Sequence, residues 1–451
     1  MDIKKIISNY KNKILLSLIW LLSFLPININ PENIFDLNSL VKIRLFFPFV
    51  IILFLSIYLL RTKNNIFNNK EIFIKLIFII YVLLGILFTL LNSNINSSLN
   101  LFWGLAMLIP YFYIFAFDDK FDQLKFFLIF SLLLIFFVFL FYIIQILHEA
   151  YLQSSAIHLY GISNPDLYYF KELNDPPRSS GLSRMAIILY IALSTFLILN
   201  NNNNNNDNNL FNIITLIISV LIGAIGLAFQ SRTMNFIFIF FIALLTFICF
   251  KKKILFKNKF LVLLIFLPLI LSVSYNYYSF NKNNDPKYFN IYKSDSLKFS
   301  QIITVIENTL IRTKQENFSS DRFENWKKVL TISKKNIIKG YGFQADRKLI
   351  QQSVHNVYLY SLICGGMLSM LIIIIISIRS AWTSFFILFS YTYSNKNIET
   401  ISLTSAFLII LLLQRSLLET SYGVYSIDYL FFLICFFMNE INYKKYYFNK
   451  T

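Results

Sequence analysis

Three arginines stand beside long apolar runs, where a permanent positive charge is costly. Arg178 and Arg184 surround the start of one run, and Arg232 lies between two others in Ser231-Arg232-Thr233. A charged side chain at the centre of a membrane helix costs about 2.5–3.5 kcal/mol. Guanidinium groups keep their charge and bind phosphate oxygens through two N–H groups at once. The three arginines therefore predict a phosphate or pyrophosphate site, with snorkelling to lipid headgroups as the structural alternative for any single one.

His355 is the second residue whose position indicates chemistry. It begins the apolar run that follows the longest polar segment, with Asn356 beside it and Ser353 as the expected helix N-cap. A helix N-terminus disfavours the imidazolium, so we expect a neutral imidazole that could accept a proton. A structural histidine at the membrane interface is the alternative. His148 and His158 lack the spacing of metal ligands and are expected to be ordinary loop residues.

The composition defines the kind of protein that must position these side chains. The chain has 451 residues, of which 57% are hydrophobic and 14% are charged. Soluble domains carry about 25% charged residues, whereas a dozen membrane helices of about 20 residues would occupy about 240 positions. The net charge of +18 is spread over short lysine strips between apolar runs, as in cytoplasmic loops. Soluble enzymes, disordered chains and nucleic-acid-binding domains are therefore disfavoured.

The apolar runs predict an all-α integral membrane protein with about twelve transmembrane helices. One further stretch, 382–393, is too short to span comfortably and is expected to be either an interfacial segment or an extension of a neighbouring helix. The twelve runs lie at about 14–29, 45–60, 72–92, 99–117, 126–147, 182–199, 210–229, 234–250, 260–275, 356–378, 398–414 and 425–438.

The lysine and arginine content of the short loops predicts that both termini are cytoplasmic. Helices 1–9 then occupy residues 1–275, a large periplasmic loop occupies 276–354, and helices 10–12 occupy 355–451. We expect this loop to be partly helical, because 323–332 is amphipathic. Basic residues within it do not contradict the topology, since long loops escape the positive-inside rule.

Other polar residues give weaker signals. Arg415 and Glu419 are four residues apart and are expected to pair on one helical face. Asp118, Asp119 and Asp122 form an acidic cluster, which we interpret as a solvated helix end. The sequence contains no Walker A loop, and no metal site or cofactor is expected.

In chain order, the motifs resemble those of the O-antigen polymerase and O-antigen ligase superfamily of bacterial inner membranes. The resemblance covers about 180–366. One departure leaves open whether Arg178 or Arg184 takes the family role, because Leu-Ser-Arg-Met follows Gly181 where the family often has an Asn-Pro-Asn-like stretch. The matching motifs are Arg178-Ser-Ser-Gly, Ser231-Arg232-Thr, and the series Arg322, Trp326, Gly340-Tyr-Gly342, His355-Asn356 and Gly365-Gly366.

The resemblance implies a metal-independent glycosyltransferase at the periplasmic face of the inner membrane. It would polymerise oligosaccharide repeats linked to undecaprenyl pyrophosphate, with His355 and Arg232 as catalytic residues. The residues expected to bind substrate are Arg178, Arg184, Arg322, Asn356, Gly340 and Gly342.

The sequence is also compatible with two other functions. A ligase that transfers the glycan to a lipid A core or a protein would use the same residues. A flippase or transporter of lipid-linked oligosaccharides would perform no chemistry and would not need the long outer loop. The expected partners are the lipid-linked glycan, the bilayer and a chain-length regulator protein, with no nucleic acid.

Overall fold

The computed structural model describes residues 72–93, 98–115, 121–152, 179–200, 209–229, 231–251, 259–282, 322–389 and 396–448. Every regular element in these ranges is a helix, which confirms the all-α class. The predicted helices at 14–29 and 45–60 lie outside the described residues, as do Arg178, His158 and most of the two long polar segments.

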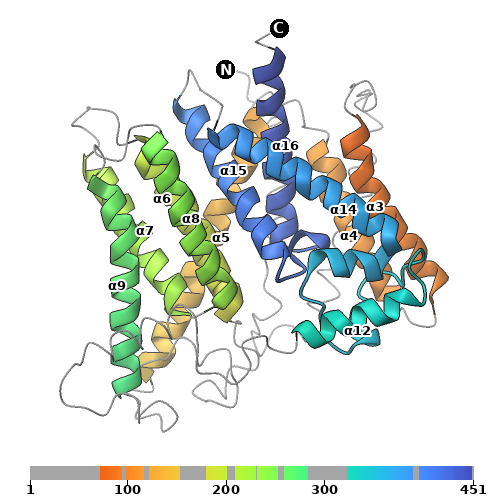
Figure 1. Ribbon diagram of the computed structural model, residues 1–451. Coiled ribbons are helices and arrows are strands. Elements are labelled where there is room, and N and C mark those ends of the chain that lie inside the picture. The colour runs from red at the N-terminus through yellow and green to blue at the C-terminus, as the bar shows by residue number, and fades with distance from the viewer. Residues whose placement is uncertain are drawn as a thin grey trace, which may run out of the picture.

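Ten of the predicted apolar runs coincide with helices in the structure (Figure 1). In chain order these are α3 (Ile72–Leu91), α4 (Ser98–Phe115), α5 (Phe121–Leu152), α6 (Ser179–Asn200), α7 (Asn209–Ala228), α8 (Arg232–Lys251), α9 (Lys259–Lys282), α14 (Val357–Phe389), α15 (Lys396–Ser416) and α16 (Ile427–Phe448). The remaining described elements are α12 (Arg322–Lys334), α13 (Asp346–Leu349) and the short 3-10 helix η4 (Ser421–Gly423).

Six helices in the described part of the chain are long and apolar enough to cross a membrane. They comprise stretches of α5, α6, α7, α8, α14 and α15, and α3 and α9 contribute shorter apolar stretches. Many large apolar side chains on these helices face outward, among them Phe137 at 63% exposure and Leu210 at 72%. Such an exterior is expected for a protein whose surroundings are lipid rather than water.

The interior is formed mainly where α14, α15 and α16 pack together. These helices also contact α3, α4 and α6, and the second group α6, α7 and α9 packs alongside. The side chains of α16 are buried along most of the helix, and those of Phe431, Phe432 and Ile434 are fully buried. Helix α16 is thus enclosed along most of its length rather than exposed on one apolar face.

Helix α14 resolves the status of residues 382–393. It continues through Trp382 to Phe389, so the described part of that stretch extends a neighbouring helix and is no separate interfacial segment. The helix is interrupted near its start, where Gly365 and Gly366 leave helical geometry and Gly366 has a φ of 73°. A positive φ of this kind is readily available only to glycine.

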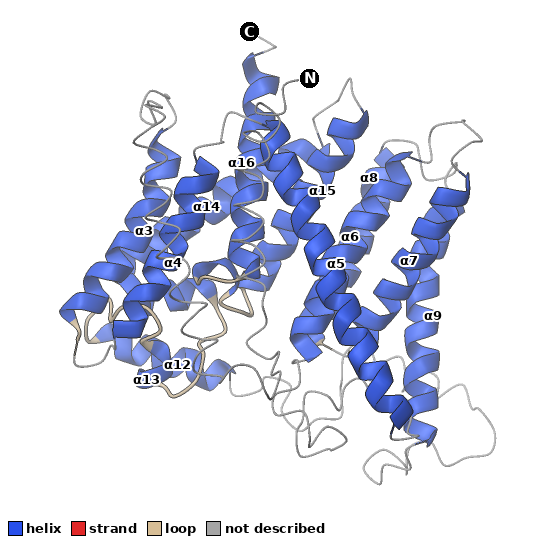
Figure 2. Cartoon of the chain, turned by 180° about the vertical axis from the view of Figure 1, so that it is seen from behind, coloured by secondary structure: helices blue, strands red, loops and turns tan. Residues whose placement is uncertain are grey.

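Contacts between helix ends show which residues share an end of the bundle. Asn356 donates to the Leu417 carbonyl, and Arg184 pairs with Asp428, so the starts of α6, α14 and α16 lie together with the end of α15. At the opposite end, Lys251 of α8 donates to the Phe389 carbonyl of α14 at 2.7 Å. Helix α12 lies across the first of these two ends, below α3 and α14 in Figure 1, and the reverse view in Figure 2 places it at the same end.

Candidate functional site

The segment that follows α12, residues 340–342, forms backbone hydrogen bonds with α14 next to its break. Tyr341 N donates to the Ile363 carbonyl at 2.6 Å, and Gly342 N donates to the Cys364 carbonyl at 2.9 Å. A Cβ atom at Gly340 would overlap the Cys364 carbonyl. Close packing therefore favours glycine at position 340, and a positive φ of 100° favours glycine at position 342. The role of these two glycines in substrate binding stays a prediction.

Both backbone polar groups of Val354, the residue before His355, are hydrogen-bonded to side chains of the loop. Val354 N donates to Asp346 Oδ2 at 3.2 Å, and the Val354 carbonyl accepts from Trp326 Nε1 at 2.8 Å. Asp346 is buried, and this burial raises the pKa of its carboxyl group. Because α12 and α13 each supply one of these contacts, the folded loop determines where His355 lies.

His355 precedes α14 in a left-handed backbone conformation, with a φ of 51°. The N-cap of the helix is Asn356, whose Oδ1 accepts from Tyr358 N and Leu359 N at 3.0 Å each. The expectation that Ser353 caps this helix was wrong, because the chain becomes helical only at Val357. His355 therefore lies just outside the helix N-terminus.

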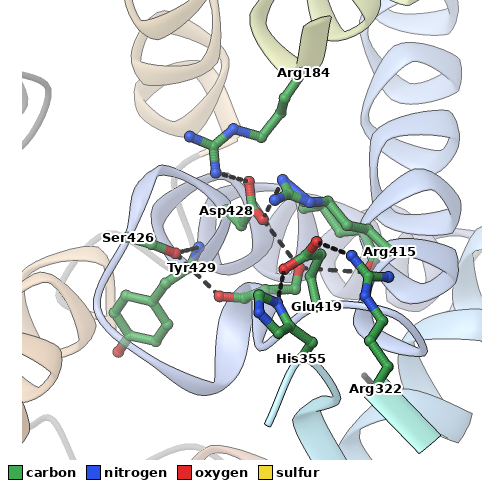
Figure 3. A network of polar contacts seen from close by, with 10 residues as sticks. Arg184, Arg322, His355, Arg415, Glu419, Ser426, Asp428 and Tyr429 are labelled. Atoms are coloured by element: carbon green, nitrogen blue, oxygen red, sulfur yellow. Dashed lines mark hydrogen bonds and ion pairs between the residues drawn. The ribbon is translucent and has the colours of Figure 1, made fainter. Parts of the chain in front are cut away.

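Glu419 connects the histidine to an arginine (Figure 3). Its Oε2 lies 2.7 Å from His355 Nδ1, and its Oε1 accepts from Arg322 Nη2 at 3.0 Å. Burial alone would raise the Glu419 pKa, but the hydrogen bond with His355 and the charges of Arg415 and Arg322 hold the pKa at about 2. Glu419 is thus ionised near neutral pH and can only accept hydrogen bonds.

This ionised acceptor determines the orientation of the histidine. His355 Nδ1 must carry a hydrogen to bind the carboxylate, so a neutral imidazole has its free lone pair on Nε2. The His355 side chain is 34% exposed, whereas that of Glu419 is 19% exposed. A carboxylate behind a partly exposed imidazole is an arrangement suited to general-base catalysis.

Next to the contact between His355 and Glu419, Asp428 forms ion pairs with two further arginines. Its Oδ1 lies 3.3 Å from Arg184 Nη1, and its Oδ2 lies 3.0 Å from Arg415 Nη1. Ser421 donates to the same Oδ2 at 3.2 Å. The side chain of Asp428 is 1% exposed, and those of the two arginines are 17% and 11% exposed. Figure 3 shows the Asp428 and Glu419 clusters side by side.

The two clusters together have a small excess of positive charge. Three arginines face two carboxylates, which leaves one net positive charge when His355 is neutral. Each carboxylate contact uses one terminal nitrogen of its guanidinium, and the buried Nε atoms of Arg184 and Arg415 have no hydrogen-bond partner in the described part of the chain. The cluster therefore retains donors that could bind an anion.

The structure brings together four of the residues that the sequence predicted for the site: Arg184, Arg322, His355 and Asn356. Arg232 is the first residue of α8, and the position of its side chain is not described. Arg178 lies outside the described residues. Of the two arginines left as alternatives, the structure describes only Arg184, which lies beside the cluster, so the choice between them stays open.

Sequence reasoning missed Asp428 and gave Glu419 the wrong partner. Arg415 binds Asp428, while Glu419 binds Arg322 and His355. The spacing rule for helical pairs does not apply here, because α15 ends at Ser416 and Glu419 is already in the following turn. An acid inside an otherwise apolar run is costly, and that cost would have marked Asp428 as a residue with a partner.

The described residues include no group of three or more histidine, cysteine, aspartate or glutamate side chains placed to hold a metal ion. Comparison of the chain with protein-family models, with curated proteins and with solved structures gives no match in any of the three.

Proposed function

We propose that the chain is a membrane-embedded glycosyltransferase that polymerises oligosaccharide repeats linked to undecaprenyl pyrophosphate, without a metal ion. The reaction would take place at the bundle end that carries His355, and this end would face the periplasm, with both termini in the cytoplasm. The observation that carries the proposal is the 2.7 Å contact between His355 Nδ1 and Glu419 Oε2 beside three arginines.

In the proposed reaction, a sugar hydroxyl of one lipid-linked unit attacks the anomeric carbon of another. The hydroxyl proton passes to His355 Nε2, and Glu419 holds Nδ1–H and stabilises the imidazolium that forms. The bond between the anomeric carbon and the pyrophosphate oxygen breaks, and the pyrophosphate leaves with the electron pair. Atoms and charge balance without a further reactant.

The arginines would act on the leaving group. Negative charge accumulates on the pyrophosphate as its bond to the sugar breaks, so donors fixed near it stabilise the transition state more than the ground state. Arg322 is the most exposed arginine of the described cluster, at 27%, and is the first candidate for this contact. Arg184 follows, and Arg178 and Arg232 remain candidates from their positions in the sequence.

The test is extension of a purified lipid-linked repeat by the purified protein in detergent, read as a ladder of products. A polymerase forms the ladder from this substrate alone, a ligase requires a lipid A core or protein acceptor, and a transporter forms no covalent product. We expect His355→Ala to lower the rate about 10²–10⁴-fold, and His158→Ala, outside the site motif, serves as the matched control. Retention of more than about a tenth of the rate by His355→Ala would remove the general base from the mechanism.

A further inference from the structure

The turn after α12 exposes two apolar side chains next to the break in α14. Ile337 is 42% exposed and Ile338 is 77% exposed. Met367 and Leu368, just beyond the break, are 41% and 52% exposed. Met367 N donates to the Ile337 carbonyl at 2.9 Å, so the two pairs adjoin. The four side chains therefore belong to one exposed apolar surface formed by two segments.

This surface continues along α14. Leu368, Leu371, Ile375 and Ile378 are all exposed, and their spacing places them on one face of the helix. The stretch Val357–Phe389 is one of the candidate membrane spans, so this face would contact lipid. Ile338 lies where that face begins, beside the break at Gly365 and Gly366. The part of α14 after the break, residues 367–389, is by itself long enough to cross a bilayer, so Ile338 lies at the expected level of the membrane boundary.

Lysines surround the exposed isoleucines. Lys334 and Lys335 precede them, Lys339 follows them, and all three are exposed. Over residues 322–339 the chain carries one arginine and five lysines but a single acid, Glu324. Lysines with apolar neighbours can extend their charged ends to the headgroup level while their stems cover apolar surface. Each lysine close to an anionic surface contributes attraction to it.

We propose that residues 334–339 anchor this end of the protein in the membrane interface. Ile337 and Ile338 insert between the headgroups and the acyl chains, and Lys334, Lys335 and Lys339 bind anionic headgroups. The anchor would keep α12, which carries Arg322, at the level of the bilayer surface. The proposal requires that the helices cross a membrane, but it does not depend on glycosyl transfer.

The depth of Ile338 can be measured on the full-length protein in vesicles. The native cysteines Cys249, Cys364 and Cys435 are buried, so a cysteine introduced at an exposed position can be labelled selectively with a fluorophore. For Ile338→Cys we expect quenching by lipids with a shallow acyl-chain nitroxide and little quenching by aqueous iodide. Lys328→Cys, an exposed position on the more polar side of α12, should show the reverse.

The choice of lipid is tested with the same label. In mixed vesicles, nitroxide-labelled phosphatidylglycerol should quench the label at 338 more than labelled phosphatidylcholine does, and salt should reduce the difference. Replacement of Lys334, Lys335 and Lys339 by glutamine should lower this preference severalfold, up to about fivefold per lysine. The matched control is the double change Arg347→Gln and Lys348→Gln at the two exposed positions of α13, which should leave the preference unchanged.

Three results would overturn the proposal. Equal iodide quenching at positions 338 and 328 would place the turn in water. Protection of position 338 from both lipid and iodide would mean that protein covers it. Equal quenching by the two labelled lipids, with Ile338 still at shallow depth, would show that the lysines do not select anionic headgroups.

Discussion

Replacement of Glu419 by glutamine removes one negative charge and leaves the shape of the side chain almost unchanged. The Glu419 carboxylate accepts hydrogen bonds from His355 and Arg322 and lies near the positive charge of Arg415. Because these contacts favour the ionised form, the pKa of Glu419 falls from 4.5 to about 2. At about 1.36 kcal/mol per pKa unit, this shift corresponds to about 3 kcal/mol of stability at pH 7. The side chain is 19% exposed, so solvent screening reduces this to about 2–3 kcal/mol.

The pH dependence follows from the sign of the shift. A carboxylate whose pKa is lowered on folding stabilises the protein above its unfolded pKa, and this stabilisation disappears as the pH falls through the folded pKa. The wild-type protein should therefore lose stability between about pH 4.5 and pH 2 in part through Glu419. Glu419→Gln should be less stable at pH 7, and the difference from the wild type should shrink over that range.

The assay is thermal unfolding in detergent, followed by tryptophan fluorescence. Trp326, one of four tryptophans, donates a hydrogen bond to the carbonyl beside His355 and so reports on this loop. If Glu419→Gln and the wild type have equal Tm at pH 7 and parallel pH profiles, the paired carboxylate does not stabilise the fold. Under the proposed function, Glu419→Gln should also slow glycan extension by up to about 10⁴-fold, because an amide no longer fixes the imidazole tautomer.

Three further changes test the surroundings of the site. Asp428→Asn leaves two arginines beside a neutral partner and should destabilise the protein by about 3–5 kcal/mol, whereas Asp122→Asn on an exposed position should have almost no effect in the same unfolding assay. Gly366→Ala should cost about 1–3 kcal/mol or more, because of the positive φ and the close Ile338 carbonyl, whereas a Cβ at Gly181 would meet no atom within 4 Å and Gly181→Ala should be tolerated. Arg232→Lys should reduce polymer output at normal protein level, since lysine lacks the planar pair of donors, and normal output would remove Arg232 from the site.

The apolar runs predicted the helices well because burial in lipid and burial in the core both select the same side chains. The sequence left the α14 extension open because Arg379 and Ser380 interrupt the apolar run. Arg379 binds Glu440 of α16 through two contacts, at 2.8 and 2.9 Å, so its charge is neutralised by a residue distant in the sequence. Hydropathy along the chain contains no information about that partner.

The local geometry around His355 could not be predicted for a related reason. Ser353 and Asn356 are both residue types that cap helices, and the sequence alone favours neither. The choice follows from Val354, whose two polar groups are held by Asp346 and Trp326, and from the left-handed backbone of His355. Contacts made by α12 and α13 thus determine where α14 begins.

The carboxylates also change how the arginines should be understood. From the sequence, Arg184 and Arg322 are expected to be free to bind a phosphate, but in the structure Asp428 already binds Arg184 and Glu419 already binds Arg322. A guanidinium has five N–H donors, so a carboxylate that occupies one nitrogen can fix its direction and leave the others for a ligand. Loss of an acid would then weaken anion binding rather than strengthen it, because the arginines would keep their charge but lose their orientation.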